Sequence, residues 1–180
     1  MNFGMSGASN QEIARTVWLQ CSALRPDLAL VQYSYPERYE IVDKDGVMFV
    51  GPWSVTAEWM PEEYREAAAD HYRHYNHEEG ALELMKSILM VQHFFEAKRI
   101  NGLAIVAIPP KALSRAVSAL YRLIDRRKVL WLPSKMRELE RRKEFFSGLE
   151  KKAADDLHYG PTVHKKAAEM IWKRCVENGI

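Results

Sequence analysis

The stretch DHYRHYNHEEG, residues 70–80, gathers the side chains of this chain that are best suited to hold a metal ion. His71 and His74 are three residues apart, so they share one face of a helix, and Glu78 extends that face if the helix continues. A zinc or iron site needs about three converging ligands, oriented by further carboxylates. His71, His74 and Glu78 are therefore the candidate ligands, although the H-x-x-H spacing itself supplies only two.

The same stretch can instead be a joint between two helices. Asn76 is a good N-cap residue, and His77, Glu78 and Glu79 would form the first turn of the helix that follows it. This interpretation explains more of the residues than a metal site does. We therefore expect a joint here, with no metal and no other cofactor.

Motifs that would fix a reaction are missing from the sequence. It contains no phosphate-binding loop, no G-x-S-x-G and no Cys/His group with convincing spacing. Cys21 and Cys175 are far apart, and each falls on the apolar side of an expected helix, where a free cysteine behaves as a small hydrophobe. We assign no catalytic residues. An enzyme is the less favoured outcome, and it would be a metal-dependent one that uses the His and Glu residues of 71–78.

The composition is that of a folded protein, with 47% hydrophobic and 28% charged residues in a chain of 180. That length suits a single domain, residues 1–180. No apolar run reaches the roughly 20 residues of a membrane span, and the start does not resemble a secretory signal. We expect a cytoplasmic protein without a membrane partner.

Hydrophobic periodicity predicts the α+β class. Residues 28–60 are rich in β-formers: a hairpin is expected around the loop at Asp43 to Gly46, and WSVTAEW, residues 53–59, alternates like a half-buried strand. A first helix is expected to start at Ser9 and to end at the turn Arg25-Pro26-Asp27. Residues 61–180 are expected to be largely helical, with helix starts at Pro61, Asn76, Ser134 and Pro161. The helix from Asn76 is expected to have Lys98 and Arg99 at its C-terminus and to be stopped by Asn101-Gly102. The expected fold is a small, mostly antiparallel N-terminal sheet packed against a helical body, with charged C-terminal helices.

Residues 103–132 can be interpreted in two ways. The β-branched run LAIVAI favours a strand, followed by a helix to about residue 126 and a second strand at 129–132. Alternatively, 103–107 is a short helix, Ile108-Pro109-Pro110 a turn and 111–124 a second helix. That layout resembles the helix-turn-helix arrangement of winged-helix DNA-binding domains, over about 30 residues. The resemblance implies that the second helix reads DNA.

Charge favours a polyanion as the partner of the C-terminal region. Residues 1–121 carry 11 Lys and Arg against 15 Asp and Glu, whereas residues 122–180 carry 15 against 9. Such asymmetry is typical of proteins that bind nucleic acid or an acidic protein. The residues expected to contact nucleic acid, DNA in the first place, are Lys111, Ser114, Arg115, Ser118, Arg122, Arg126, Arg127, Lys128, Arg137 and Arg141.

Two alternatives remain open at this point. The chain can be a small interaction or inhibitor module that uses aromatic residues at Trp53, Trp59, Tyr33 or Tyr35. The long charged helix expected at 135–158 can also serve as an arm for homodimerisation, with an apolar seam. The interaction module, like the nucleic-acid-binding protein, is expected to have a regulatory role.

Overall fold

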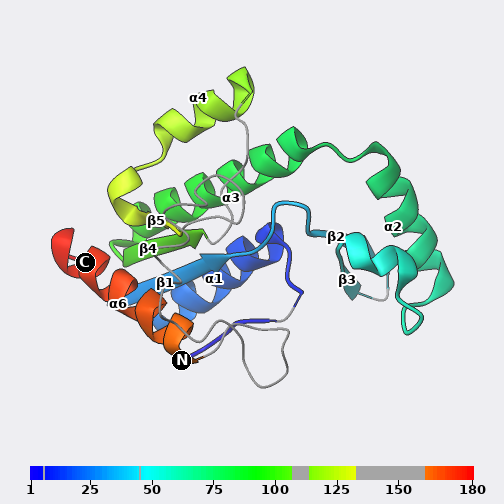
Figure 1. The fold of residues 1–180 in the computed structure, drawn as a ribbon. Coiled ribbons are helices and arrows are strands. Elements are labelled where there is room, and N and C mark those ends of the chain that lie inside the picture. Colours follow the sequence, from blue (N-terminus) through cyan, green and yellow to red (C-terminus); the bar gives the residue numbers. More distant parts are fainter. Residues whose placement is uncertain (6, 45, 107–113, 133–160) are drawn as a thin grey trace.

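The computed structural model describes residues 1–5, 7–44, 46–106, 114–132 and 161–180. Within these ranges, three parallel strands form the central sheet in the order β1-β4-β5 (Figure 1). These strands are β1 (Leu28–Tyr33), β4 (Asn101–Val106) and β5 (Val129–Trp131). Leu28 lies opposite Asn101, and Ala104 lies opposite Val129. The fold is therefore mixed α and β, as the sequence predicts.

Helices cover both faces of this sheet. On one face, the largest core cluster joins alternate strand residues such as Val31, Val106 and Val129 to three helices. These are α1 (Asn10–Leu24), α3 (His77–Lys98) and α4 (Arg115–Leu123). On the other face, Leu103 and Leu130 pack against Cys175 of α6 (Pro161–Glu177). Both cysteines are buried and free, as expected.

A smaller unit with its own core is inserted between β1 and α3 (Figure 1). Its hairpin is the antiparallel pair expected around Asp43, whose carboxylate accepts a hydrogen bond from the amide of Gly46. Val50, Met60 and Ala68 form the centre of its core. The elements of this unit are β2 (Tyr39–Asp43), β3 (Gly46–Val50), the 3₁₀ helix η1 (Pro52–Thr56) and α2 (Glu62–His74).

The strand expected at residues 53–59 is wrong. Pro52 begins a 3₁₀ turn there, and the hydroxyl of Ser54 accepts a hydrogen bond from the amide of Gly51. A Cβ at Gly51 would overlap the ring of Trp53, so this glycine lets the ring lie over the backbone. The alternation of residue types in WSVTAEW therefore follows a turn, and both tryptophans stay exposed, Trp59 by 71%.

The strand-helix-strand interpretation of residues 103–132 is confirmed by β4, α4 and β5. The helix-turn-helix arrangement is wrong, because residues 103–106 are strand and pair with β1. The end of α3 lies where Lys98 and Arg99 predict it, with Arg99 as the C-cap, while Asn101 and Gly102 already belong to β4. Gly102 is needed for packing, since a Cβ there would overlap the ring of Phe95.

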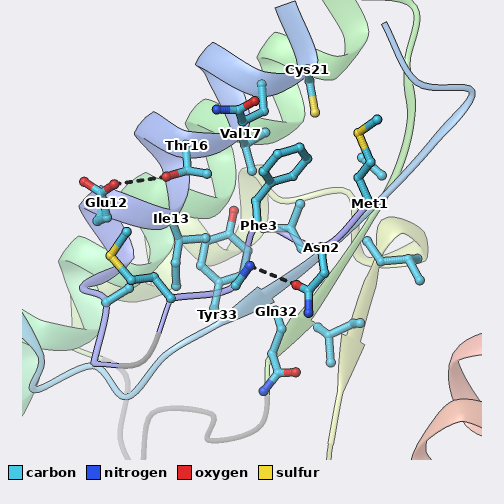
Figure 2. A pocket seen from close by; sticks show the side chains of 18 of the residues that line it. Met1, Asn2, Phe3, Glu12, Ile13, Thr16, Val17, Cys21, Gln32 and Tyr33 are labelled. Atoms are coloured by element: carbon cyan, nitrogen blue, oxygen red, sulfur yellow. Dashed lines mark hydrogen bonds between the residues drawn. The ribbon is translucent and has the colours of Figure 1, made fainter. Parts of the chain in front are cut away.

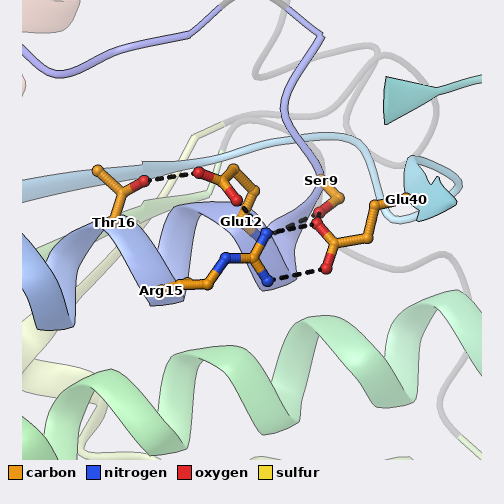
Figure 3. A network of polar contacts seen from close by, with 5 residues as sticks. All are labelled: Ser9, Glu12, Arg15, Thr16 and Glu40. Carbon is orange, nitrogen blue, oxygen red and sulfur yellow. Dashed lines mark hydrogen bonds and ion pairs between the residues drawn. The ribbon is translucent and has the colours of Figure 1, made fainter. Parts of the chain in front are cut away.

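A polar network ties the smaller unit to α1 (Figure 3). Ser9 caps α1 by accepting a hydrogen bond from the amide of Glu12, as predicted. The hydroxyl of Ser9 donates to Glu40 of β2, and Arg15 bridges Glu40 and Glu12. The Glu12 side chain does not reach back to close a capping box; it accepts from Arg15 and Thr16 instead. Glu40 therefore supplies the carboxylate that the positive end of α1 favours.

Among the described helices, none combines the length and the apolar character that crossing a membrane would need.

Candidate nucleic-acid interface

The amino ends of the three parallel strands meet at one edge of the sheet, and each strand is entered from a helix. Arg25 connects α1 to β1, and Arg99 connects α3 to β4. The 3₁₀ helix η2 (Arg126–Lys128) connects α4 to β5. Because neighbouring strands lie about 4.8 Å apart, the three connections are gathered within roughly 10 Å across the sheet. The topology therefore concentrates basic residues that are up to 103 positions apart in the chain.

Arg25 and Arg99 share an uncommon backbone conformation. Each caps its helix in the left-handed region, with φ of 47° and 57°, and they are the two non-glycine residues with positive φ in the described part of the chain. Glycine is the usual residue at such a cap, because a side chain there costs about 1 kcal/mol. Strain of this kind is often retained at functional sites. The two connections therefore leave their helices in the same way, and each carries an arginine at its cap.

The third connection is fixed by Gln92 of α3, whose side chain is 7% exposed. Its amide nitrogen donates to the carbonyl of Asp125 at 3.1 Å, and its oxygen accepts from the amide of Asp125 at 3.0 Å. The Asp125 carboxylate in turn caps η2 and accepts two hydrogen bonds from the Arg127 side chain. These hydrogen bonds from Arg127 hold the pKa of Asp125 below its ordinary value. The turn at Asp125 is thus fixed by Gln92 through its backbone and by Arg127 through its side chain.

Helix α6 supports the same turn from the other face of the sheet. Arg174 is half-buried, and its Nη2 lies 3.4 Å from the carbonyl oxygen of Arg126 and 3.3 Å from that of Val129, to which it donates. The guanidinium of Arg126 lies over the ring of Tyr121, 5.9 Å from its centroid. Arg174 therefore has a positioning role, while Arg126 is exposed.

We call these six residues the basic edge: Arg25, Lys98, Arg99, Arg126, Arg127 and Lys128. All are exposed except Lys128, which is half-buried. The described carboxylates on the same connections and in the last turn of α3 are Asp27, Glu96 and Asp125, and only Asp125 is paired with a basic-edge residue. The basic edge therefore keeps an excess of positive charge after its internal pairing.

The structure places the predicted binding residues in three groups. Arg126, Arg127 and Lys128 lie on the basic edge. Arg115, Ser118 and Arg122 follow the three- and four-residue spacing of one face of α4, and both arginines are exposed. Ser114 has a structural role instead, because its hydroxyl caps α4 by accepting from the amide of Val117. Lys111, Arg137 and Arg141 lie outside the described residues, as does the helix expected at 135–158.

Arg25, Lys98 and Arg99 were missed by sequence reasoning, although a signal existed. The strand-helix-strand interpretation already implied a parallel pair, β4 and β5, with both amino ends at one edge. The basic residues before each strand would then have been grouped together. What the sequence does not reveal is that β1, more than 70 residues earlier, joins the same sheet.

The histidine stretch forms the predicted joint. Helix α2 ends at His74, and Asn76 caps α3 by accepting from the amide of Glu79 at 2.8 Å. The ring of His71 stacks on Tyr39 with centroids 3.7 Å apart, so its face is already used in packing. Within the described ranges, no three His, Cys, Asp or Glu side chains are grouped to hold a metal. His71, His74 and Glu78 therefore do not converge as ligands.

Packing at this joint predicts a dependence of stability on pH. Burial lowers the pKa of His71, and the nearby Glu79 opposes this only in part. The unfolded chain therefore takes up a proton more readily than the folded chain as the pH falls below about 6.5. We expect the melting temperature to fall between pH 7 and pH 5 by more in the wild type than in His71→Phe. His74→Gln, at an exposed site, should behave as the wild type; equal slopes for all three proteins would contradict the role of His71.

A second exposed feature lies at the other end of β1. The guanidinium of Arg38 is stacked between Tyr35 and Trp53, 5.3 Å and 4.9 Å from their ring centroids, and it donates to the hydroxyl of Ser34 at 2.9 Å. Tyr35 is 42% exposed and Trp53 45% exposed, in line with the aromatic-surface hypothesis. Tyr33 does not belong to this surface, because it is buried and its hydroxyl donates to the carbonyl of Ser87.

The site thus consists of a preorganised basic edge, flanked by the outer face of α4 and separate from an arginine–aromatic stack. The geometry of the basic edge offers hydrogen-bond donors and positive charge, and its six described residues include no hydroxyl or thiol nucleophile. Comparison with family models, with curated proteins and with solved structures finds no match for this chain.

Proposed function

We propose that this protein binds nucleic acid, double-stranded DNA in the first place, through the basic edge and in a regulatory rather than catalytic role. The observation that carries the proposal is the convergence of three helix-to-strand connections that all present arginine or lysine side chains. Phosphates are the natural ligands of such a surface, because Arg and Lys that neutralise them release condensed counterions. The strained Arg25 and Arg99 support a use for these charges beyond solubility.

The contacts are expected to go to the backbone rather than to the bases. The basic edge is made of turns and helix ends, and it presents no helix along its length that would enter a major groove. Arg115, Ser118 and Arg122 on α4 are placed to extend the contact beyond the edge. Binding of this kind positions a protein on DNA without reading its sequence, with dissociation constants of about 10⁻⁴–10⁻⁶ M at physiological salt.

Fluorescence anisotropy with a labelled duplex of unrelated sequence tests the proposal. For about five phosphate contacts, the logarithm of the binding constant should fall against the logarithm of salt concentration with a slope of roughly −4.5. Duplexes of different sequence should bind within a few-fold of one another. An absence of binding at low salt, or binding that does not respond to salt, would overturn the proposal.

The Tyr35–Arg38–Trp53 stack supports a second candidate function, as a contact for a protein partner. Tyr, Trp and Arg are the residue types that most often dominate binding energy at protein interfaces. Here the three side chains are already stacked on each other, so little side-chain freedom is lost on binding. Partner binding that resists salt and is lost in Trp53→Ala, but kept when the basic edge is neutralised, would favour this candidate over DNA. An acidic protein bound at the basic edge would show the opposite pattern: its binding would weaken with salt, survive Trp53→Ala and be lost when the basic edge is neutralised.

A further inference from the structure

Strand β1 lies at the border of the central sheet with one side unpaired. It is hydrogen-bonded to β4, and in the described part of the chain no strand pairs with its other side. Residues 1–5 lie beside it, over a groove of about 890 Å³ between α1 and β1 (Figure 2). Their hydrogen bonds are local: the amide of Gly4 donates to the Asn2 side chain, and the carbonyl of Met5 accepts from Ala8. They therefore add no strand to the sheet.

A border of this kind normally carries protection; here residues 1–5 lie beside it without adding a strand, and β1 carries no protection in its own sequence. Natural border strands are shielded by charged residues, proline or a bulge, because an unprotected one pairs with other chains. The sequence of β1, LALVQY, has no charge and no proline, and its ladder with β4 runs without a bulge. Leu28 and Leu30 are 41% and 50% exposed. These leucines belong to the face on which α6 buries Leu103 and Leu130.

We propose that the unpaired side of β1 binds β1 of a second copy of this chain, in antiparallel register around a two-fold axis, and that residues 1–5 move aside when it does. A two-fold axis perpendicular to the joined sheet keeps equivalent faces on the same side, so the axis must pass midway between the two copies of one residue of the strand. Placing it at Leu30 sets the half-exposed leucines of both copies against each other. Placing it at Val31 would bury less additional apolar surface, because Val31 is packed in the core and only 4% of it is exposed.

The chemistry of the strand explains why a second copy is the occupant. An uncharged strand can face itself without placing like charges opposite one another, which would be destabilising. In the register centred on Leu30, Leu28 lies opposite Gln32 of the second copy, and Asp27 lies opposite Tyr33, so no two like charges meet along the paired strands.

Cysteine cross-linking tests the register without any nucleic acid. Under mild oxidation, Leu30→Cys should form a disulfide-linked dimer of twice the 20.9 kDa chain mass as its main product. Leu28→Cys and Gln32→Cys should each remain mostly monomeric, whereas the double variant Leu28→Cys/Gln32→Cys should cross-link. The native Cys21 and Cys175 are buried, so they should contribute little background. Cross-linking of Leu30→Cys no faster than that of Gln32→Cys would overturn the proposal.

Sedimentation supplies a second measurement that does not depend on cysteine. The wild type should sediment as a dimer at micromolar concentration, and Leu30→Lys should sediment as a monomer with unchanged circular dichroism, because this side chain is half exposed. A monomeric wild type would overturn the inference, as would a Leu30→Lys dimer. The oligomeric state measured in this way is independent of the proposed DNA binding, because DNA binding requires the basic edge and not Leu30.

Discussion

Replacing Lys98, Arg126 and Lys128 with glutamine should weaken binding to duplex DNA on the order of 100-fold or more at about 0.1 M salt. Each lost phosphate contact removes roughly 0.9 from the salt slope, and at 0.1 M that corresponds to nearly tenfold in affinity. The three side chains come from two different helix-to-strand connections, so the variant probes the basic edge as a surface. Anisotropy titrations at several salt concentrations give both the affinity and the slope.

The matched control removes the same charge elsewhere. Lys44→Gln/Arg73→Gln/Lys86→Gln alters three exposed cations on the hairpin, on α2 and on α3, away from the connections that form the basic edge. If binding depended only on net charge, this control would lose as much affinity as the basic-edge variant. We expect it to lose no more than a few-fold and to keep the wild-type slope. Equal losses of DNA affinity in the two variants would show that the basic edge is not the interface.

Arg25 and Arg99 allow charge to be separated from stability. Glycine adopts the left-handed conformation of both residues without steric cost, so Arg25→Gly/Arg99→Gly relieves backbone strain in the folded state. The same substitutions increase the conformational entropy of the unfolded chain. These effects oppose each other, and the free energy of unfolding should change by at most about 1 kcal/mol per site. DNA affinity should nevertheless fall, and Arg25→Lys/Arg99→Lys should largely retain it.

Local signals in the sequence predicted the features that depend on local chemistry. Ser9 and Asn76 cap helices as expected, because a hydroxyl or amide oxygen before a helix finds the free amides of its first turn. Residues 103–106 are strand, as their β-branched content favours. The failures have physical causes too: the alternation in WSVTAEW is overridden by Pro52 and by the approach of Trp53 to Gly51.

The basic edge depends on contacts that a single sequence does not display. The turn at Arg25 and the helix end at Arg99 were predicted from local signals, but those signals do not show that the two connections lie side by side. Pairing of β1 with β4 brings together residues more than 70 positions apart, and no motif marks it. Half of the proposed interface, on α4 and η2, was therefore predictable from charge and amphipathic spacing, while the half on the α1 and α3 connections required the sheet topology.

Replacing Gln92 with leucine should destabilise the protein by about 2–4 kcal/mol. The side-chain amide is the partner of both the amide and the carbonyl of Asp125, and leucine leaves these two groups without a partner at a part-buried site. Each such group costs about 1–3 kcal/mol. Urea unfolding at 25 °C measures the change, and for a chain of this length it corresponds to roughly 4–16 °C in melting temperature.

Gln92→Glu shows whether the loss comes from these two hydrogen bonds or from packing. An ionised glutamate still accepts from the amide of Asp125 but places negative charge against its carbonyl, whereas a protonated one donates to that carbonyl as glutamine does. Burial next to a carbonyl raises the pKa of the folded glutamate above that of the unfolded chain, so the folded state gains stability relative to the wild type as the pH falls. The deficit of Gln92→Glu should therefore shrink between pH 7 and pH 5, while that of Gln92→Leu should stay constant. Because Asp125 caps η2, both variants should also bind DNA less tightly at pH 7, and unchanged affinity in a destabilised Gln92→Leu would show that the basic edge does not need this support.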